Sequence, residues 1–175
     1  MFARPEYQDA AVSNWFANYD PGYPTYSTTK GKNIGANGGL YNRNGRAYPD
    51  VAANGAWTHC TFKPELLFIV PLLTRAIVYA DGNLIREGGT SMAAPLVASI
   101  INLLNEERLA AGKATVGFVN PTFYGNPQAF HDITIGANQG CGLTFAFNCT
   151  PGWDPVTGLG TPNYSVLKEV FMQLP

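Results

Sequence analysis

The sequence predicts an α/β domain, and three observations support this prediction. A Gly-rich turn at 88–89 precedes a long run whose apolar residues recur at helical spacing. Short apolar runs at 49–53 and 76–80 are typical of buried strands. Helical patterns also lie near both ends of the chain, at 7–19 and after Asn163. Helices combined with apolar strands in this way indicate helices packed on the faces of a sheet.

The first predicted element is a surface helix over residues 7–19. Its apolar face is formed by Val12, Trp15, Phe16 and Tyr19. Glu6 and Asp9 lie near its start, and we interpret them as solvated charges that interact favourably with the helix dipole. Residues 20–45 are rich in Pro, Tyr, Gly and Asn, which predicts a long irregular loop.

The central predicted helix runs from Ser91 to about Ala110, and Gly112 is a suitable stop. Pro95 fits best in the first turn, where its missing N–H costs little. Ser91 is therefore expected at a helix N-terminus, either as a simple cap or as a nucleophile facing a developing oxyanion. Asn163 is expected to cap a short last helix whose inward residues are Val166, Leu167, Val170 and Phe171.

The octapeptide at 88–95, Gly-Gly-Thr-Ser-Met-Ala-Ala-Pro, resembles the nucleophile motif of subtilisin-like serine peptidases. It is not the Gly-x-Ser-x-Gly elbow of α/β-hydrolases, so an esterase or lipase has no support. The rest of the chain resembles the sedolisins, serine-carboxyl peptidases related to tripeptidyl peptidase I. This resemblance rests on the segments 45–53, 118–121 with Tyr124, 130–134 and above all 152–163, Gly-Trp-Asp-Pro-Val-Thr-Gly-Leu-Gly-Thr-Pro-Asn.

The resemblance implies a subtilisin-like parallel sheet with flanking helices, truncated at the N-terminus. Residues 1–175 would be the C-terminal portion of the peptidase domain, with an anomalous insertion at about 55–76. The implied activity is peptide-bond hydrolysis at acidic pH with Ser91 as the nucleophile. In this family a Glu serves as the base, an Asp four residues later orients it, and a separate Asp helps to form the oxyanion hole. A carboxylate base suits acidic solution, where His would be protonated.

The acid half of this machinery is absent from the sequence. No acidic residue has a second carboxylate four positions later. A histidine base is not supported either, because neither His59 nor His131 lies in a subtilisin-type His motif ahead of the serine. We therefore expect this chain on its own to be inactive. The alternatives are a non-catalytic calcium-binding fragment or pseudoenzyme, and a subtilisin-family fragment.

The resemblance also implies a site for one Ca²⁺ ion. Its ligands would be the carboxylates of Asp132 and Asp154 and the carbonyl oxygens of Ile133 and Gly152, which is hard-cation chemistry. The family has Gly where this chain has Thr150, so a further carbonyl ligand there stays open. The competing interpretation is that the two aspartates simply cap turns. No other cofactor is expected.

The composition of the chain limits the kinds of molecule that it is expected to bind. The net charge is −1, so neither nucleic acid nor an anionic membrane is indicated, and we expect a monomer acting on a peptide or protein substrate. Pairing of Cys141 with Cys149 would fit a secreted or lumenal protein. Asn148 and Asn163 begin N-glycosylation patterns. We expect residues 1–5 not to be part of a signal peptide, because they lack an apolar core of the needed length, and for the intact family member we expect an extracellular or a lysosome- or vacuole-like location.

Residues 55–76 interrupt two family-like segments with an apolar run from Leu66 to Leu73. The run is too short for a membrane span and is broken by Pro71. It is either a natural substrate-site loop or, as we prefer, a retained intron translated in frame.

Overall fold

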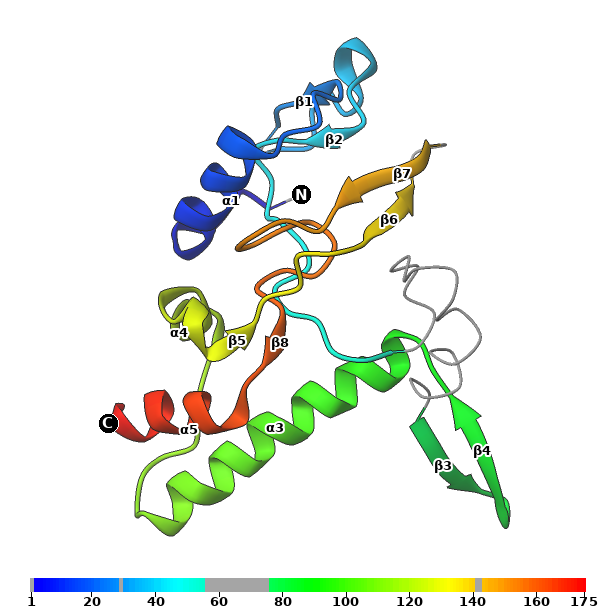
Figure 1. The fold of residues 1–175 in the computed structure, drawn as a ribbon. Helices are drawn as coiled ribbons and strands as arrows, with labels where there is room; N and C mark the ends of the chain where they lie inside the picture. The colour runs from blue at the N-terminus through cyan, green and yellow to red at the C-terminus, as the bar shows by residue number, and fades with distance from the viewer. Residues whose placement is uncertain (1, 29, 56–75, 141–142) are drawn as a thin grey trace.

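The computed structural model describes residues 2–28, 30–55, 76–140 and 143–175, and these form a mixed helix-and-strand structure (Figure 1). The helical elements are α1 (Glu6–Asn18), η1 (Ala36–Gly38), α3 (Thr90–Ala110), α4 (Asn120–Gly125), η3 (Pro127–Ala129) and α5 (Tyr164–Gln173). The strands are β1 (Thr25–Tyr26), β2 (Tyr41–Asn42), β3 (Ala76–Ala80), β4 (Asn83–Glu87), β5 (Phe130–His131), β6 (Ala137–Gly140), β7 (Leu143–Asn148) and β8 (Thr161–Pro162).

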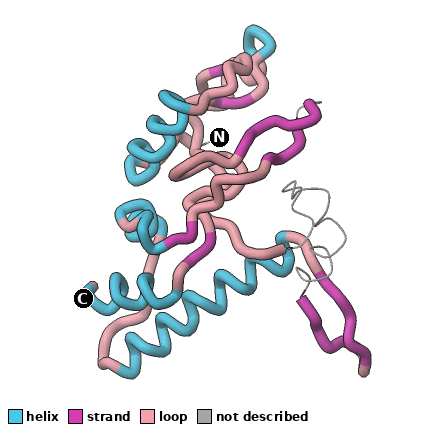
Figure 2. Tube along the Cα trace, in the orientation of Figure 1, coloured by secondary structure: helices cyan, strands magenta, loops and turns pink. Residues whose placement is uncertain are grey.

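The described strands pair only in twos, as Figure 2 shows. β1 and β2 are parallel, whereas β3–β4, β5–β8 and β6–β7 are antiparallel. β6–β7 contains a bulge between Asn138 and Gly140. The mixed α/β class is confirmed, but the large parallel sheet that we expected is not seen among the described residues.

α3 is the longest helix, and its start agrees with the prediction. Gly89 adopts φ +89°, a conformation that favours glycine, and Thr90 and Ser91 open the helix. Pro95, however, lies in the second turn rather than the first. Because Pro95 has no N–H, the Ser91 carbonyl lacks the hydrogen bond that it would accept from residue 95 in a regular helix. Gly112 follows the helix with φ +73°, as a C-terminal stop should.

Packing against the long helix involves α5, which Figure 1 shows alongside α3. The Asn163 side chain caps α5 by accepting a hydrogen bond from Val166 N at 3.4 Å, as predicted. Leu167 and Phe171 point inward and are buried. They belong to a core contributed by several elements, whose buried residues are Val12, Trp15, Leu104, Phe123, Ala129, Phe130, Trp153, Leu159, Leu167 and Phe171.

α1 covers one side of this core, so its role as an amphipathic helix is confirmed. Val12 and Trp15 are buried, at 2% and 3% exposure, and Phe16 is half-buried. Tyr19 lies just beyond the helix end and is 37% exposed, so it is not part of the buried face. Asp9 pairs with Arg4 at 2.8 Å and remains largely exposed, which agrees with a solvated surface charge.

Two strand predictions need correction. Residues 49–53 form no strand, because the segment makes single main-chain bonds to the 158–160 region instead of a ladder. Residues 76–80 do form β3, but it is not buried. Its side chains Ile77 and Tyr79 are 68% and 73% exposed, and Leu84 on β4 is 73% exposed. The β3–β4 hairpin projects from the body near the start of α3 (Figure 1).

Candidate functional site

Ser91 lies in the first turn of α3 and its side chain is exposed. The turn before it is fixed by main-chain bonds, since Gly89 N donates to Gly55 O and Met92 N donates to Gly89 O at 3.0 Å. A Cβ at Gly55 would come within 2.7 Å of Gly89 O, so the two segments are in direct contact. Gly55 therefore supports the serine turn.

Among the described residues, no side chain is placed to act as a general base for the Ser91 hydroxyl. No hydrogen bond joins its hydroxyl to a carboxylate or an imidazole within residues 2–28, 30–55, 76–140 and 143–175. His131, one alternative base, lies on β5 with an exposed side chain and pairs with Thr161 through the main chain. His59 lies outside the described residues, as do Cys141 and most of the segment 55–76.

Asp154 organises a loop that we call the Asp154 loop, residues 150–160. Its carboxylate is completely buried and accepts hydrogen bonds from three main-chain N–H groups and one hydroxyl. The donors are Thr150 N at 2.9 Å, Val156 N at 2.9 Å, Thr157 N at 2.8 Å and Thr157 Oγ1 at 3.2 Å. Burial raises the pKa of Asp154 above its ordinary value, although these hydrogen bonds oppose the rise.

Asp132 directly follows β5 and contacts the same loop. Its exposed carboxylate accepts a hydrogen bond from Gly152 N at 2.8 Å, and Gly152 has φ +81°. Gly160 packs so closely on this segment that a Cβ there would lie 2.1 Å from His131 O. The structure thus brings the loop against residues 131–132, next to Ile133, and the four predicted ligand residues lie in two adjoining segments.

These contacts are also what turn-capping aspartates would make. The part of the chain that the structure describes contains no group of three or more His, Cys, Asp or Glu side chains able to hold a metal. The absence of such a group does not exclude a site built from two carboxylates and main-chain carbonyls, because that site needs only two side chains of these types. The Thr150 main chain contributes its N–H to Asp154, and its hydroxyl is buried with no partner among the described atoms.

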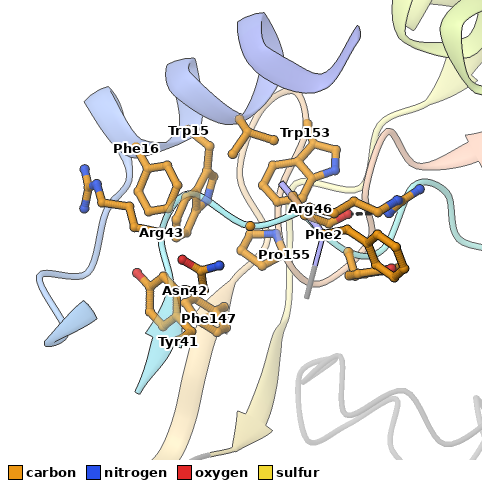
Figure 3. Close-up of a pocket in the computed structure, with 14 residues that line it drawn as sticks. Phe2, Trp15, Phe16, Tyr41, Asn42, Arg43, Arg46, Phe147, Trp153 and Pro155 are labelled. Carbon is orange, nitrogen blue, oxygen red and sulfur yellow. Dashed lines mark hydrogen bonds between the residues drawn. The ribbon is translucent and has the colours of Figure 1, made fainter. Parts of the chain in front are cut away.

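A cavity of about 390 Å³ lies beside the Asp154 loop, between α1, residues 41–48 and β7 (Figure 3). Trp153 and Pro155 of the loop line it together with aromatic side chains, which include Trp15, Phe16, Tyr41 and Phe147. Ser91 and the predicted calcium ligands are not among the residues that line it. The cavity is therefore separate from both predicted sites.

Sequence reasoning missed one polar cluster. Gln8, Asp50 and Tyr124 bond to one another beneath the loop, with Arg46 as a fourth member. Arg46, Asp50 and Tyr124 lie in segments whose family-like sequence we recognised, and Gln8 lies in the predicted first helix, but nothing in the sequence indicated that the four meet. The described helices include none that is both long and apolar enough to cross a membrane.

Comparison with known proteins shows that the chain is similar in sequence to fungal peptidases. No family model matches the chain. It is 47% identical over all 175 residues to tripeptidyl-peptidase sed1 of Aspergillus fumigatus and 47% identical to aorsin of Aspergillus oryzae. It spans 24% of each of these relatives. A solved Pseudomonas sedolisin, a serine-carboxyl proteinase bound to two molecules of pseudo-iodotyrostatin, aligns with 57% of this chain and 27% of its own, at 26% identity and a TM-score of 0.49.

Proposed function

Because this chain belongs to the sedolisin family of peptidases, we propose that Ser91 is the nucleophile of a serine-type peptidase that hydrolyses peptide bonds in acidic solution. The observation that carries this proposal is the placement of Ser91. Ser91 is exposed, comes two residues after a glycine with φ +89°, and is the second residue of a helix of 21 residues. The first N–H groups of such a helix and its dipole favour negative charge, as a tetrahedral oxyanion requires.

The serine turn leaves donors for this purpose. Within the described part of the chain, the N–H groups of Thr90 and Ser91 donate to no main-chain carbonyl, whereas those of Met92 and Ala93 point to Gly89 O. The proposed chemistry needs a base as well. In the family that base is a Glu, and a Glu can still accept a proton under conditions where His is charged.

We propose that the 175-residue chain alone does not turn over peptides. No carboxylate pair with the family spacing occurs in the sequence, and the described structure gives Ser91 no base. A positioned general base contributes about 10²–10⁴ in rate, so its absence removes most of the activity. The second candidate function is a non-catalytic calcium-binding fragment or pseudoenzyme. It is favoured by the hydrogen bonds that order the loop around Asp154, whereas the hydroxyl of Ser91 has no carboxylate or imidazole partner in the part of the chain that the structure describes.

The residues present fit a calcium ion. All the ligand atoms would be oxygens, which suits a hard cation. Asp132 and Asp154 would supply carboxylates, and Ile133 and Gly152 would supply main-chain carbonyls. Asp132 is bonded to Gly152, and Asp154 is buried where a cation would offset the cost of its desolvated charge. When bound, calcium would contribute structural stability by joining residues 132–133 to the Asp154 loop.

A subtilisin-like parallel sheet in the complete domain is part of the proposal. The exposed apolar side chains of Ile77, Tyr79 and Leu84 are of the kind that further sheet or helix would cover. The substrate would be a peptide or protein, cleaved by endopeptidase or tripeptidyl-peptidase action. The protein would act as a monomer outside the cell or in a lysosome- or vacuole-like compartment.

An assay of the purified chain on an internally quenched peptide at acidic pH tests these proposals. We expect the purified 175-residue chain to show no peptidase activity above that of its Ser91→Ala variant. A complete family protein that carries this sequence should cleave the same peptide and lose the activity with Ser91→Ala. If Ser91→Ala left the complete protein fully active, the assignment of the nucleophile would be wrong. Clear Ser91-dependent turnover by the 175-residue chain would instead show that a base had been overlooked.

A further inference from the structure

A buried polar hub lies at the contact between α1, α4 and residues 46–50. We define the hub as Gln8, Arg46, Asp50 and Tyr124. Gln8 is fully buried, and its Nε2 lies 2.7 Å from Tyr124 Oη and 3.1 Å from both Asp50 Oδ1 and Ala47 O. Its Oε1 accepts from Ala47 N at 3.1 Å. Both ends of the Gln8 amide are therefore used, which fixes its orientation.

Asp50 is the acceptor at the centre of the hub. One carboxylate oxygen accepts from Tyr124 Oη at 3.0 Å as well as from Gln8, and the other accepts from Arg46 at 2.5 Å. Burial, together with the charge of Asp50, raises the pKa of Tyr124, so its phenol remains a donor to Asp50 at ordinary pH. Three donors from three separate segments thus hold one side chain.

The main chain at Asp50 in turn holds the Asp154 loop. Asp50 O accepts from Leu159 N at 2.9 Å, and Pro49 O accepts from Trp153 Nε1 at 2.9 Å. A Cβ on Gly158 would lie 2.4 Å from the carbonyl carbon and oxygen of Asp50, so the two backbones touch without room for a side chain. Ala52 N donates to Gly160 O at 3.0 Å. The loop is therefore bonded to residues 49–52 on both sides of Asp154.

From these contacts we propose that the hub is a positioning device for cation binding: by holding Asp50 it holds the Asp154 loop in the conformation that presents Asp154 and the Gly152 carbonyl. The inference rests on the calcium part of the proposed function. None of the hub side chains would touch the cation. They act through Asp50, whose main chain makes the contacts to Leu159 and Gly158.

The physical reason is the cost of leaving the loop free. A calcium site needs several oxygens at once, and a loop that samples many conformations loses entropy when the ion binds. Groups that orient metal ligands commonly change metal affinity by about 10–100-fold when they are replaced. Removing Gln8 or Tyr124 leaves the shared oxygen of the partly buried Asp50 carboxylate with one donor in place of two, which weakens the hold on Asp50 and favours movement of its main chain.

The experiment uses the whole 175-residue chain. Tyr124→Phe removes only the hydroxyl that Asp50 and Gln8 share. Gln8→Met is a second variant of similar shape without the amide. Tyr164→Phe is the matched control, because it removes a tyrosine hydroxyl that donates to a carboxylate, Glu107 at 3.3 Å, away from the loop. Calcium affinity is measured by titration calorimetry with CaCl₂, and amide hydrogen exchange is measured in EDTA.

We expect Tyr124→Phe and Gln8→Met each to weaken calcium binding about tenfold, at the lower end of the range for orienting groups. In EDTA, exchange at the amides of Leu159 and Thr157 should accelerate, while that of Leu167, which is bonded to Asn163 O in α5, should not change. Tyr164→Phe should leave both measurements unchanged.

Three results would overturn the inference. One is parent-like calcium affinity together with unchanged loop exchange in both hub variants. The second is acceleration of exchange at Leu167 as large as at Leu159, since the hub would then support the whole fold and not this loop. The third is an equal effect of Tyr164→Phe. If the parent chain binds no calcium, the calcium part of the proposed function fails and with it the role of the hub in cation binding, whatever the loop exchange shows.

Discussion

Trp153 and Pro49 lie 104 residues apart in the sequence, and the indole N–H of Trp153 donates to the Pro49 carbonyl at 2.9 Å. Trp153 is 5% exposed and packs edge-on against Trp15 with ring centroids 6.2 Å apart. One side chain therefore connects the Asp154 loop to the 46–55 segment by a hydrogen bond and to α1 by its ring. That segment continues to Gly55, whose carbonyl accepts from Gly89 beside Ser91.

This bond predicts the effect of Trp153→Phe. The smaller ring lacks the donor and leaves Pro49 O unpaired in a partly buried position. The free energy of unfolding should fall by about 1–3 kcal/mol, measured by urea denaturation. Phe118→Leu is the control, since the Phe118 side chain is 71% exposed and its substitution should change stability little. Equal losses in the two variants would contradict a specific role for the Trp153 bond.

Tyr41 predicts a dependence of stability on alkaline pH. Its hydroxyl is buried with no hydrogen-bond partner among the described residues, and burial raises the pKa of Tyr41 to about 12, with a further contribution from Asp20. The unfolded chain releases this proton near pH 10. The stability that the raised pKa provides is therefore complete below about pH 10 and is lost as the pH rises towards 12.

Tyr41→Phe should remove this dependence. At pH 7 the variant should be as stable as the parent or more stable by about 1 kcal/mol, because it no longer buries an unpaired hydroxyl. Between pH 9 and 11 its free energy of unfolding should decline less steeply. Tyr48→Phe is the comparison, because the Tyr48 side chain is 64% exposed. A parent-like decline in Tyr41→Phe would assign the alkaline effect to another group.

Arg108 predicts a large loss of stability when it is replaced. It is 3% exposed, donates to Ala114 O at 2.7 Å and also bonds to Phe171 O, so it ties the end of α3 to α5. Hydrogen bonds from a charged donor contribute about 1.5–3 kcal/mol each, so Arg108→Met should cost about 3 kcal/mol or more in urea unfolding. Arg108→Lys should lose less than Arg108→Met, because its ammonium keeps a charged donor for one of the carbonyls, but it should not match the parent, because a single ammonium cannot span both. A fully stable Arg108→Met would refute this account.

Local signals in the sequence predicted the elements that depend on local chemistry. Ser91 at the start of α3 followed from the glycines before it, and Asn163 as the cap of α5 followed from its side chain. The apolar run at 49–53 misled us, because its main chain bonds to a loop more than a hundred residues away rather than to a neighbouring strand. The hub was beyond prediction for the same reason, as Gln8 and Tyr124 are 116 residues apart. The prediction that β3 is buried was wrong too. Its side chains are apolar, but no described element covers them.

The calcium proposal predicts that EDTA lowers the melting temperature of the folded protein and that excess Ca²⁺ restores it. An ion that binds only the folded state stabilises it by about 2.7 kcal/mol at a concentration a hundred times its Kd. The measurement is a thermal melt with CaCl₂ and with EDTA, and MgCl₂ serves as the control for ionic strength. Identical melting curves in CaCl₂ and EDTA would leave turn-capping as the account of both aspartates.

The two aspartates separate cation binding from turn-capping. Thr150 donates to one Asp154 oxygen, and Val156 and Thr157 donate to the other. Asp154→Asn turns one of these oxygens into an amide donor that faces an N–H group, so it should destabilise the protein even in EDTA, by about 1–3 kcal/mol. Asp132 is exposed and, among the described residues, accepts only from Gly152, so Asp132→Asn should melt close to the parent in EDTA but gain little from calcium. Asp132→Asn is therefore the stricter test. If it kept the full response to calcium while Asp154→Asn lost stability, Asp154 would be a structural cap and the ion, if any, would bind elsewhere.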